Sequence, residues 1–360
     1  IIVKYINILI CLVLMLSCER NANNVVDLPV EDAKFVLFAK PENGKSLELF
    51  IEKSKGVLDL GSTLVPGDTY IAIADENGNI LMYSDGIKIY DGSYNLMKGA
   101  PSSLQEPRKG GAPASSVQGA LSLGMASNPD IINFFTTTSI DEEEISGLRL
   151  HIIDLVKEGN GTSANPLGEV VVYDSLLAPN SCEMLTAYST CSSDTAWVIG
   201  HEQETSNFIV ILVDAHGVQS VTLQNLPTQN SSTYGYGRGS LKFNSNGTKL
   251  VMTGLNEAGT NLFDFDKHTG ILSNPVNIAR EETYYSYPIN GYGVEFSPDD
   301  TKLYISGQFG LIQYDLLTGE DVFMHDKTLA QIEQGPDGKL YVAKWSQNTD
   351  AHLGIIENPN

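Results

Sequence analysis

Residues 291–319 read GYGVEFSPDDTKLYISGQFGLIQYDLLTG, and this stretch decides the fold. It contains three short apolar runs that are separated by two turn signals, SPDD and a D-x-x-T-G sequence. Pro, Asp and Gly supply the backbone dihedrals that reverse a chain, so the pattern predicts antiparallel strands joined by tight turns.

The same pattern recurs along the chain. When the second strand of each copy is aligned, the equivalent positions are Ile80, Ile132, Trp197, Leu250, Leu303 and Leu340. Their spacing is close to the period of about forty to fifty residues that propeller blades show, with one long insertion. The repeats therefore predict an all-β protein, a β-propeller made of four-stranded antiparallel blades.

The third strand of five copies ends in an acidic residue. An Asp carboxylate can accept hydrogen bonds from the N–H groups of a turn, and Gly tolerates a positive φ. We expect these acids to build turns, with metal binding as the alternative. The residues are Asp91, Asp154, Asp214, Asp266 and Asp315, the last two being followed by Gly270 and Gly319.

The two chain ends bear on the number of blades. The last copy ends at residues 353–360, LGIIENPN, before any fourth strand. A propeller closes by pairing strands from both chain ends in one blade, and the hairpin predicted at Phe35–Ile51 has no other partner. We therefore expect residues 34–360 to form seven blades, the last one incomplete because the chain is truncated at Asn360.

Residues 1–18 have the pattern of a signal peptide. Lys4 precedes an apolar run of about eleven residues, too short to cross a bilayer of roughly 30 Å as a helix. Leu16-Ser17-Cys18 resembles the lipobox of bacterial lipoproteins, in which the Cys is acylated, and an ordinary secretory signal is the alternative. We expect an exported protein that is lipid-anchored at Cys18 to the outer membrane, on its periplasmic or cell-surface side, with residues 19–33 as a tether.

Cys182 and Cys191 invite a disulfide in an exported protein. The segment between them, EMLTAYST, alternates like a single strand. At about 3.3 Å per residue its ends lie roughly 30 Å apart, whereas a disulfide needs about 6 Å between Cα atoms. We expect two free, buried thiols.

The net charge of −22 is unusual for a chain with 42% hydrophobic and 18% charged residues, a composition otherwise typical of packed globular proteins. An acidic surface repels phosphate backbones, and Arg108 and Lys109 form only a pair. We therefore expect no nucleic-acid partner, and contact with a membrane only through the lipid anchor.

Several stretches between residues 70 and 360 resemble a known family, in the same order along the chain. They include ADENGNILMYSDGIKIYD, CEMLTAYSTCSSDTAWVIGHE, YGVEFSPDDTKLYIS and GPDGKLYVA. The family is the N-terminal β-propeller domain of surface proteins from gliding bacteria with type IX secretion, and FSPDDTKLY is also similar to the repeats of WD-like and YVTN-like propellers. The resemblance implies a surface binding or adhesion role and supplies no catalytic motif. A lipobox departs from the family's plain signal, so its secretion route is not carried over.

The long predicted loops, 100–117, 230–238 and 281–292, fall mostly on one face of a propeller. Binding residues concentrate on loops over a rigid scaffold, and Tyr offers a flat apolar face with a polar tip that suits sugars or protein partners. Packing of the loops over the inner strands is the alternative. The candidate ligand-binding residues are Tyr234, Tyr236, Arg238, Tyr284, Tyr285, Tyr287, His201 and Glu202.

Segments that contain possible metal ligands lack the spacing of a metal site. The HEQE sequence at His201 has no second His four residues on, as a zinc helix would have. Asp141 to Glu144 are adjacent acids, a pattern typical of a solvated face rather than a calcium loop. We therefore assign no catalytic residue, metal ligand or cofactor.

Three charged residues, Lys242, Glu295 and Glu333, occupy the same position in consecutive inner strands. We expect a Lys242–Glu295 pair between neighbouring blades, because pairing would satisfy both charges. A polar lining of the central channel is the alternative. Together the sequence favours a non-catalytic surface propeller that binds a glycan or a protein, with a lactonase-like, metal-assisted hydrolase acting in the channel as the second hypothesis.

Overall fold

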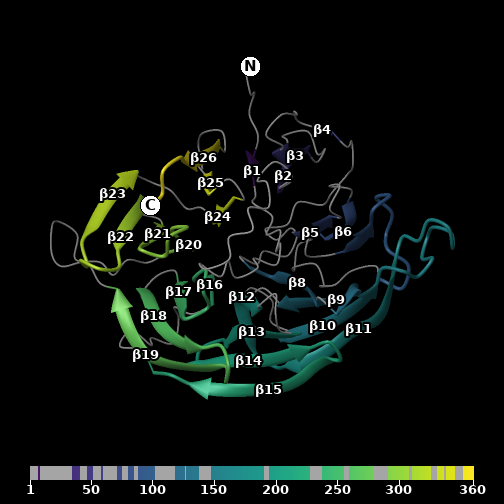
Figure 1. Cartoon of the computed structure of the whole chain (residues 1–360), viewed down its shortest axis with the longest axis horizontal. Coiled ribbons are helices and arrows are strands. Elements are labelled where there is room, and N and C mark those ends of the chain that lie inside the picture. Colours follow the sequence, from purple (N-terminus) through teal and green to yellow (C-terminus); the bar gives the residue numbers. More distant parts are fainter. Residues whose placement is uncertain are drawn as a thin grey trace, which may run out of the picture.

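The computed structural model contains β-strands as its regular elements in the residues that it describes (Figure 1). No helix long and apolar enough to cross a membrane is found in that part of the chain. The predicted all-β class is confirmed. The described residues are the strands within 1–59 and, after them, 71–74, 80–84, 88–101, 118–125, 127–137, 147–189, 194–227, 237–254, 259–278, 291–307, 310–325, 331–335, 338–344 and 352–360.

Six antiparallel sheets stand around a common axis as the blades of a β-propeller (Figure 1). In each blade the first strand in the chain is innermost. Blades 1 to 3 are β5 (Ile71–Ala74), β6 (Ile80–Ser84) and β7 (Ile89–Asp91); β8 (Ala120–Met125), β9 (Asn128–Thr137), β10 (Leu148–Asp154) and β11 (Glu169–Ala178); and β12 (Ser181–Ser189), β13 (Thr195–Glu202), β14 (Asn207–Asp214) and β15 (Gly217–Asn225). Blades 4 to 6 are β16 (Gly239–Phe243), β17 (Lys249–Gly254), β18 (Gly259–Asp266) and β19 (Ile271–Ile278); β20 (Gly293–Phe296), β21 (Lys302–Gly307), β22 (Gly310–Asp315) and β23 (Asp321–His325); and β24 (Ile332–Gln334), β25 (Leu340–Lys344) and β26 (His352–Ile356).

The predicted count of seven blades is wrong, because the ring has six blades of three or four strands. The prediction required the hairpin Phe35–Ile51 to belong to a seventh blade that closes the ring after the six visible repeats. Instead, β2 (Phe35–Lys40) and β3 (Leu47–Ile51) pair with β1 (Asn7–Ile8) and β4 (Leu58–Asp59) in a separate small sheet, whose edge strands have two residues each. The blade β24–β26 therefore keeps three strands.

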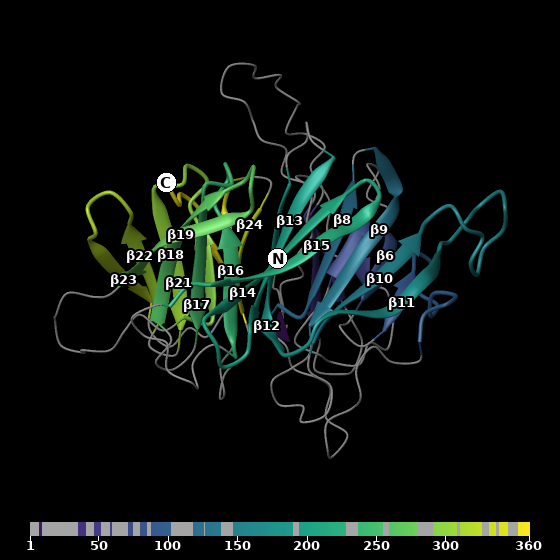
Figure 2. The same cartoon turned by 90° about the horizontal axis from the view of Figure 1, so that it is seen from below.

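The directions of the strands define two faces of the ring, which Figure 2 shows from the side. The inner strands of blades 3, 4 and 5 begin on one face, at Ser181, Gly239 and Gly293. We name this face the loop face. Because the strands are antiparallel, the strand ends that the three predicted long loops connect all lie on it. The other strand ends, joined by tight turns such as the one between β14 and β15, lie on the opposite face, which we name the turn face.

Apolar side chains fill the space between successive blades. Between blades 3 and 4, for example, Phe208 and Phe263 are fully buried, with ring centroids 5.0 Å apart and planes at 73°. This edge-to-face arrangement is one that aromatic pairs prefer. Such clusters join blade 1 to blade 2 and each later blade to the next one up to blade 6, so the inner strands are held in fixed positions around the axis.

The acidic residues at the ends of the third strands build turns, as predicted. Each carboxylate accepts one or more hydrogen bonds from backbone N–H groups of the turn that follows it. Hydrogen bonds from His268 N–H and Thr318 N–H are the main cause that lowers the pKa of Asp266 and of Asp315, respectively. The acceptors and donors are Asp91 with Ser93 and Asn95, Asp154 with Val156, Asp214 with His216, Asp266 with His268, and Asp315 with Leu317 and Thr318.

The two D-x-x-T-G turns allow a matched prediction. Gly270 and Gly319 have similar positive φ values, 71° and 75°, so Ala at either position should cost about 1 kcal/mol of backbone strain. A Cβ on Gly270 would also lie 2.4 Å from the Trp197 ring, whereas one on Gly319 would have no atom closer than 3.5 Å. We expect Gly270→Ala to lower the free energy of unfolding by about 2 kcal/mol and Gly319→Ala by about half of that, as measured by urea denaturation. Equal losses would contradict the packing of Trp197 against this turn.

Candidate functional site

The innermost strands bring three charged side chains together at the axis of the ring. Lys242 of β16 places its Nζ 3.1 Å from Glu295 Oε2 of β20 and 2.6 Å from Glu333 Oε2 of β24. The three side chains are 9%, 8% and 12% exposed, respectively. The predicted pair between Lys242 and Glu295 is confirmed, and Glu333 joins it from a third blade. We name these three residues the axial cluster.

The axial cluster holds two carboxyl groups against one ammonium group. Burial alone would lower the pKa of Lys242, but the attraction of both carboxylates outweighs burial and raises it. For Glu295 burial is the largest effect: it raises the pKa of the carboxyl to about 7, with Lys242 opposing the rise and Glu333 adding to it. One ammonium cannot balance two buried carboxylates, so a proton on Glu295 removes the unbalanced charge.

A layer of neutral hydrogen bonds lies beside the axial cluster, nearer the loop face. Ser240 Oγ donates to the carbonyl oxygen of Tyr292 at 2.8 Å and lies 3.2 Å from Gln331 Oε1. Gln331 Nε2 also donates to the Tyr292 carbonyl oxygen at 3.2 Å. Ser240 and Gln331 each precede a cluster residue by two positions, so they lie on the same side of their strands as Lys242 and Glu333.

Blade 2 is tied to blade 4 across the inner strand of blade 3. Gln118 Oε1 accepts a hydrogen bond from the Leu241 N–H at 2.8 Å, and Gln118 Nε2 donates to the Leu241 carbonyl oxygen at 3.1 Å. The N–H of Gln118 donates to the carbonyl oxygen of Glu183 in β12. Polar groups near the axis are therefore hydrogen-bonded to one another from blade to blade.

The donor set at the axis does not fit a metal ion. The two carboxylates that an ion would need, Glu295 and Glu333, both contact the Lys242 ammonium, whose charge would repel a second cation. Among the residues that the structure describes, no group of three or more His, Cys, Asp or Glu side chains could hold a metal ion.

The predicted ligand-binding residues fall into two groups. Arg238, His201 and Glu202 are described and lie at strand ends on the loop face, with Arg238 half-buried just before β16. The tyrosines and the predicted lipidation residue lie outside the described residues, namely Tyr234, Tyr236, Tyr284, Tyr285, Tyr287 and Cys18.

His201 and Glu202 are engaged within blade 3. The His201 ring is 1% exposed and packs edge-on against Phe208, and burial lowers its pKa to about 4. Glu202 Oε2 accepts a hydrogen bond from Asn207 Nδ2 at 2.7 Å and so holds the connection between β13 and β14. The neutral imidazole of His201 is therefore part of the core, and Glu202 lies at the edge of the loop face.

Cys182 is a free thiol in the core between blades 3 and 4, which confirms the prediction for this residue. It is fully buried, and burial raises the pKa of the thiol to about 12. A thiol that stays protonated and inaccessible is unreactive. Cys191 lies outside the described residues.

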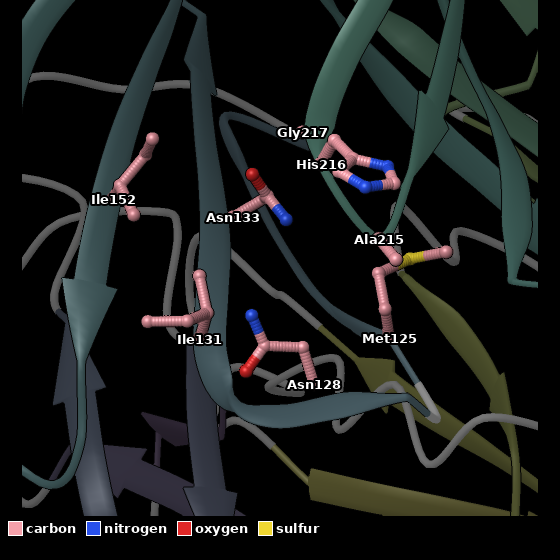
Figure 3. Close-up of a pocket in the computed structure, with 8 residues that line it drawn as sticks. All are labelled: Met125, Asn128, Ile131, Asn133, Ile152, Ala215, His216 and Gly217. Carbon is pink, nitrogen blue, oxygen red and sulfur yellow. The ribbon is translucent and has the colours of Figure 1, made fainter.

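A cavity of about 150 Å³ lies on the turn face between blades 2 and 3 (Figure 3). Blade 2 supplies Met125, Asn128, Ile131, Asn133 and Ile152, and the turn 215–217 of blade 3 closes the other side. No sequence motif marks this cavity, because its lining comes from two blades. The one signal in the sequence is Asn133, a polar residue in the apolar second strand of blade 2.

No protein-family model matches the chain, and no curated protein matches it. Among solved structures, hydrazine synthase from Kuenenia stuttgartiensis is 14% identical with a TM-score of 0.51, over 89% of this chain and 92% of that one. The Dos1 propeller is 11% identical with a TM-score of 0.48, over 90% and 76% of the two chains. A putative 6-phosphogluconolactonase from Bacteroides uniformis is 12% identical with a TM-score of 0.45, over 82% and 81%. At these identities the likeness shows the fold alone, and this chain is similar to β-propeller proteins of diverse function.

Proposed function

We propose that this protein is a non-catalytic binding or scaffold module that recognises a glycan or a protein partner through its loop face. The observation that carries the proposal is the position of Lys242 between Glu295 and Glu333. The Lys242 ammonium forms ion pairs with both axial carboxylates, so these side chains connect three blades at the axis. The same rigid ring presents the strand ends of the long loops on one face, where binding residues usually gather.

A lactonase-like, metal-assisted hydrolase is the competing function. It would use axial carboxylates to hold a divalent ion, and that ion would have to displace the Lys242 ammonium. Metal analysis of the purified full chain separates the two functions. A stoichiometric divalent ion retained after dialysis would favour the hydrolase, and a metal-free chain that binds its partner would favour the binding module.

We further propose that the chain is exported and anchored to the outer membrane through a lipid on Cys18. The support is the lipobox and the resemblance of the repeats to propellers of bacterial surface proteins. Mass spectrometry of the protein from its membrane fraction tests this, because an unacylated Cys18 would contradict the anchor.

The loop-face proposal predicts that two tyrosines carry much of the binding energy. In the double variant Tyr284→Ala/Tyr285→Ala, we expect binding of the best ligand from a panel of soluble glycans to weaken by at least about tenfold, because aromatic anchors dominate such contacts. Isothermal titration measures the change. Tyr173→Ala, at a 44% exposed tyrosine on the outer strand of blade 2, is the matched control and should bind normally. Unchanged binding by the double variant would remove the tyrosines from the contact surface.

A further inference from the structure

The cavity between blades 2 and 3 has the dimensions of a single ring. Its volume is about 150 Å³, and a cavity of about this volume in another protein binds benzene. Pockets for drug-sized ligands are at least about twice as large. A hydrogen bond from the Ser127 N–H of blade 2 to Asp194 Oδ1 of blade 3 joins the two blades at their adjacent turns on the turn face, so it helps to hold the two walls of the cavity in place.

The walls of the cavity favour an apolar, neutral occupant. Met125, Ile131, Ile152 and Ala215 supply aliphatic surface, and none of the lining residues is Asp, Glu, Lys or Arg. The thioether of Met125 and the imidazole of His216 both suit an aromatic ring, through sulfur and ring contacts. A sugar would leave most of its hydroxyl groups without partners against these walls.

One polar group in the cavity lacks a partner. Asn133 is 3% exposed, and its Oδ1 has no hydrogen-bond partner. Figure 3 shows the amide nitrogen of Asn133 directed toward the turn that carries His216 and the oxygen directed away. A rotation of the amide by 180° would exchange the two atoms. The amide can therefore donate to a ligand in the cavity or accept from one, and a buried polar group without a partner is costly to the free protein.

We propose that this cavity binds one small, neutral aromatic ring that carries a hydroxyl group. The ring lies against Met125, Ile131 and Ile152, and the hydroxyl reaches the Asn133 amide, where it can accept from Nδ2 or donate to Oδ1. The His216 side chain lines the cavity and is 88% exposed, so it lies at the edge of the cavity that faces solvent, and its turn is held by the hydrogen bond from the His216 N–H to Asp214 Oδ1. The site lies on the turn face and does not depend on the loop-face function.

The test compares two rings that differ only in the hydroxyl group, using the full chain. 4-Methylphenol should bind about tenfold more tightly than toluene, because the hydroxyl adds one hydrogen bond to a buried group. In Asn133→Leu the side chain keeps its approximate size and loses its polar atoms, so the preference should fall below about twofold. Ligand-observed NMR gives the affinities, and the His216 ring signals report on the site.

Two further measurements keep the test decisive. Ala215→Leu should weaken the binding of both ligands, because the larger side chain fills the cavity. Asn133→Leu should raise the thermal midpoint of unfolding, since it removes a buried amide oxygen that has no hydrogen-bond partner. Binding of N-acetyl-tyrosinamide as well would assign the site to a tyrosine side chain of a partner, whereas binding of free 4-methylphenol alone would assign it to a small molecule. The proposal is overturned if neither ring binds, if both bind equally, or if the preference survives Asn133→Leu.

Discussion

Replacing Lys242 by Met is expected to lower the free energy of unfolding by about 3–5 kcal/mol at pH 8. Met approximates the length of the side chain and removes the ammonium, so Glu295 and Glu333 would face each other without a cation. All three side chains are nearly buried, and water cannot replace the lost partner. Removing one member of a buried ion pair costs much more stability than replacing the whole pair by neutral side chains, because the remaining charge stays desolvated. Urea denaturation followed by tryptophan fluorescence measures the loss.

Two controls separate charge from packing in this experiment. The triple variant Lys242→Met/Glu295→Gln/Glu333→Gln removes every charge of the axial cluster and should recover most of the lost stability. The loss in Lys242→Met should also shrink at pH 5, which lies below the pKa of Glu295, because a proton on that carboxyl removes one of the two unbalanced charges. A single variant that stays within about 1 kcal/mol of the wild type at pH 8 would show that the axial cluster is not a buried charge site.

The axial cluster shows why a repeat sequence predicts some contacts well. In a ring of equivalent strands, residues at the same position of successive inner strands lie at the same height and face the same axis. Lys242 and Glu295 could therefore be paired from the repeat alignment alone. The same reasoning succeeded for Asp266 and Asp315, because a turn is a local structure whose hydrogen bonds connect residues close in sequence.

The number of blades and the cavity lined by Asn133 could not be predicted from the sequence, and the reason differs for each. The blade count depended on the partner of one hairpin, and nothing in the period of the repeats says that β2 and β3 pair with β1 and β4. The cavity depends on a small gap between the β8–β9 region and the turn 215–217, which belong to different blades. Period and composition predict which face of a strand is buried, but they do not predict where two buried faces fail to fill the space between them.

Glu295→Gln is expected to remove a pH dependence of stability that the wild type has. The folded pKa of Glu295 is about 7, whereas its ordinary value is 4.5, so between these values the folded chain holds a proton that the unfolded chain has lost. The stabilisation from Glu295 is therefore fully present below about pH 4.5 and is lost as the pH rises through 7. The shift corresponds to about 3 kcal/mol over the whole titration. The amide of the variant does not titrate, so the wild type should lose this amount relative to the variant between about pH 4 and pH 8.

The comparison with the variant is essential, because other carboxyl groups of this chain act in the opposite direction. A hydrogen bond from Asn274 is the main cause that lowers the pKa of Asp264. For Asp299 burial acts to raise the pKa, but hydrogen bonds from Ser297 and Thr301 together outweigh burial and lower it. Such groups stabilise the fold above their unfolded pKa values and lose that effect as the pH falls, so the pH profile of the wild type alone would mix both signs. Urea denaturation of both chains at matched pH values isolates Glu295. Parallel profiles from pH 4 to pH 8 would mean that the pKa of Glu295 is the same in the folded and the unfolded chain. Glu295 would then be ionised at neutral pH, and the axial cluster would carry a net negative charge that Lys242 does not balance.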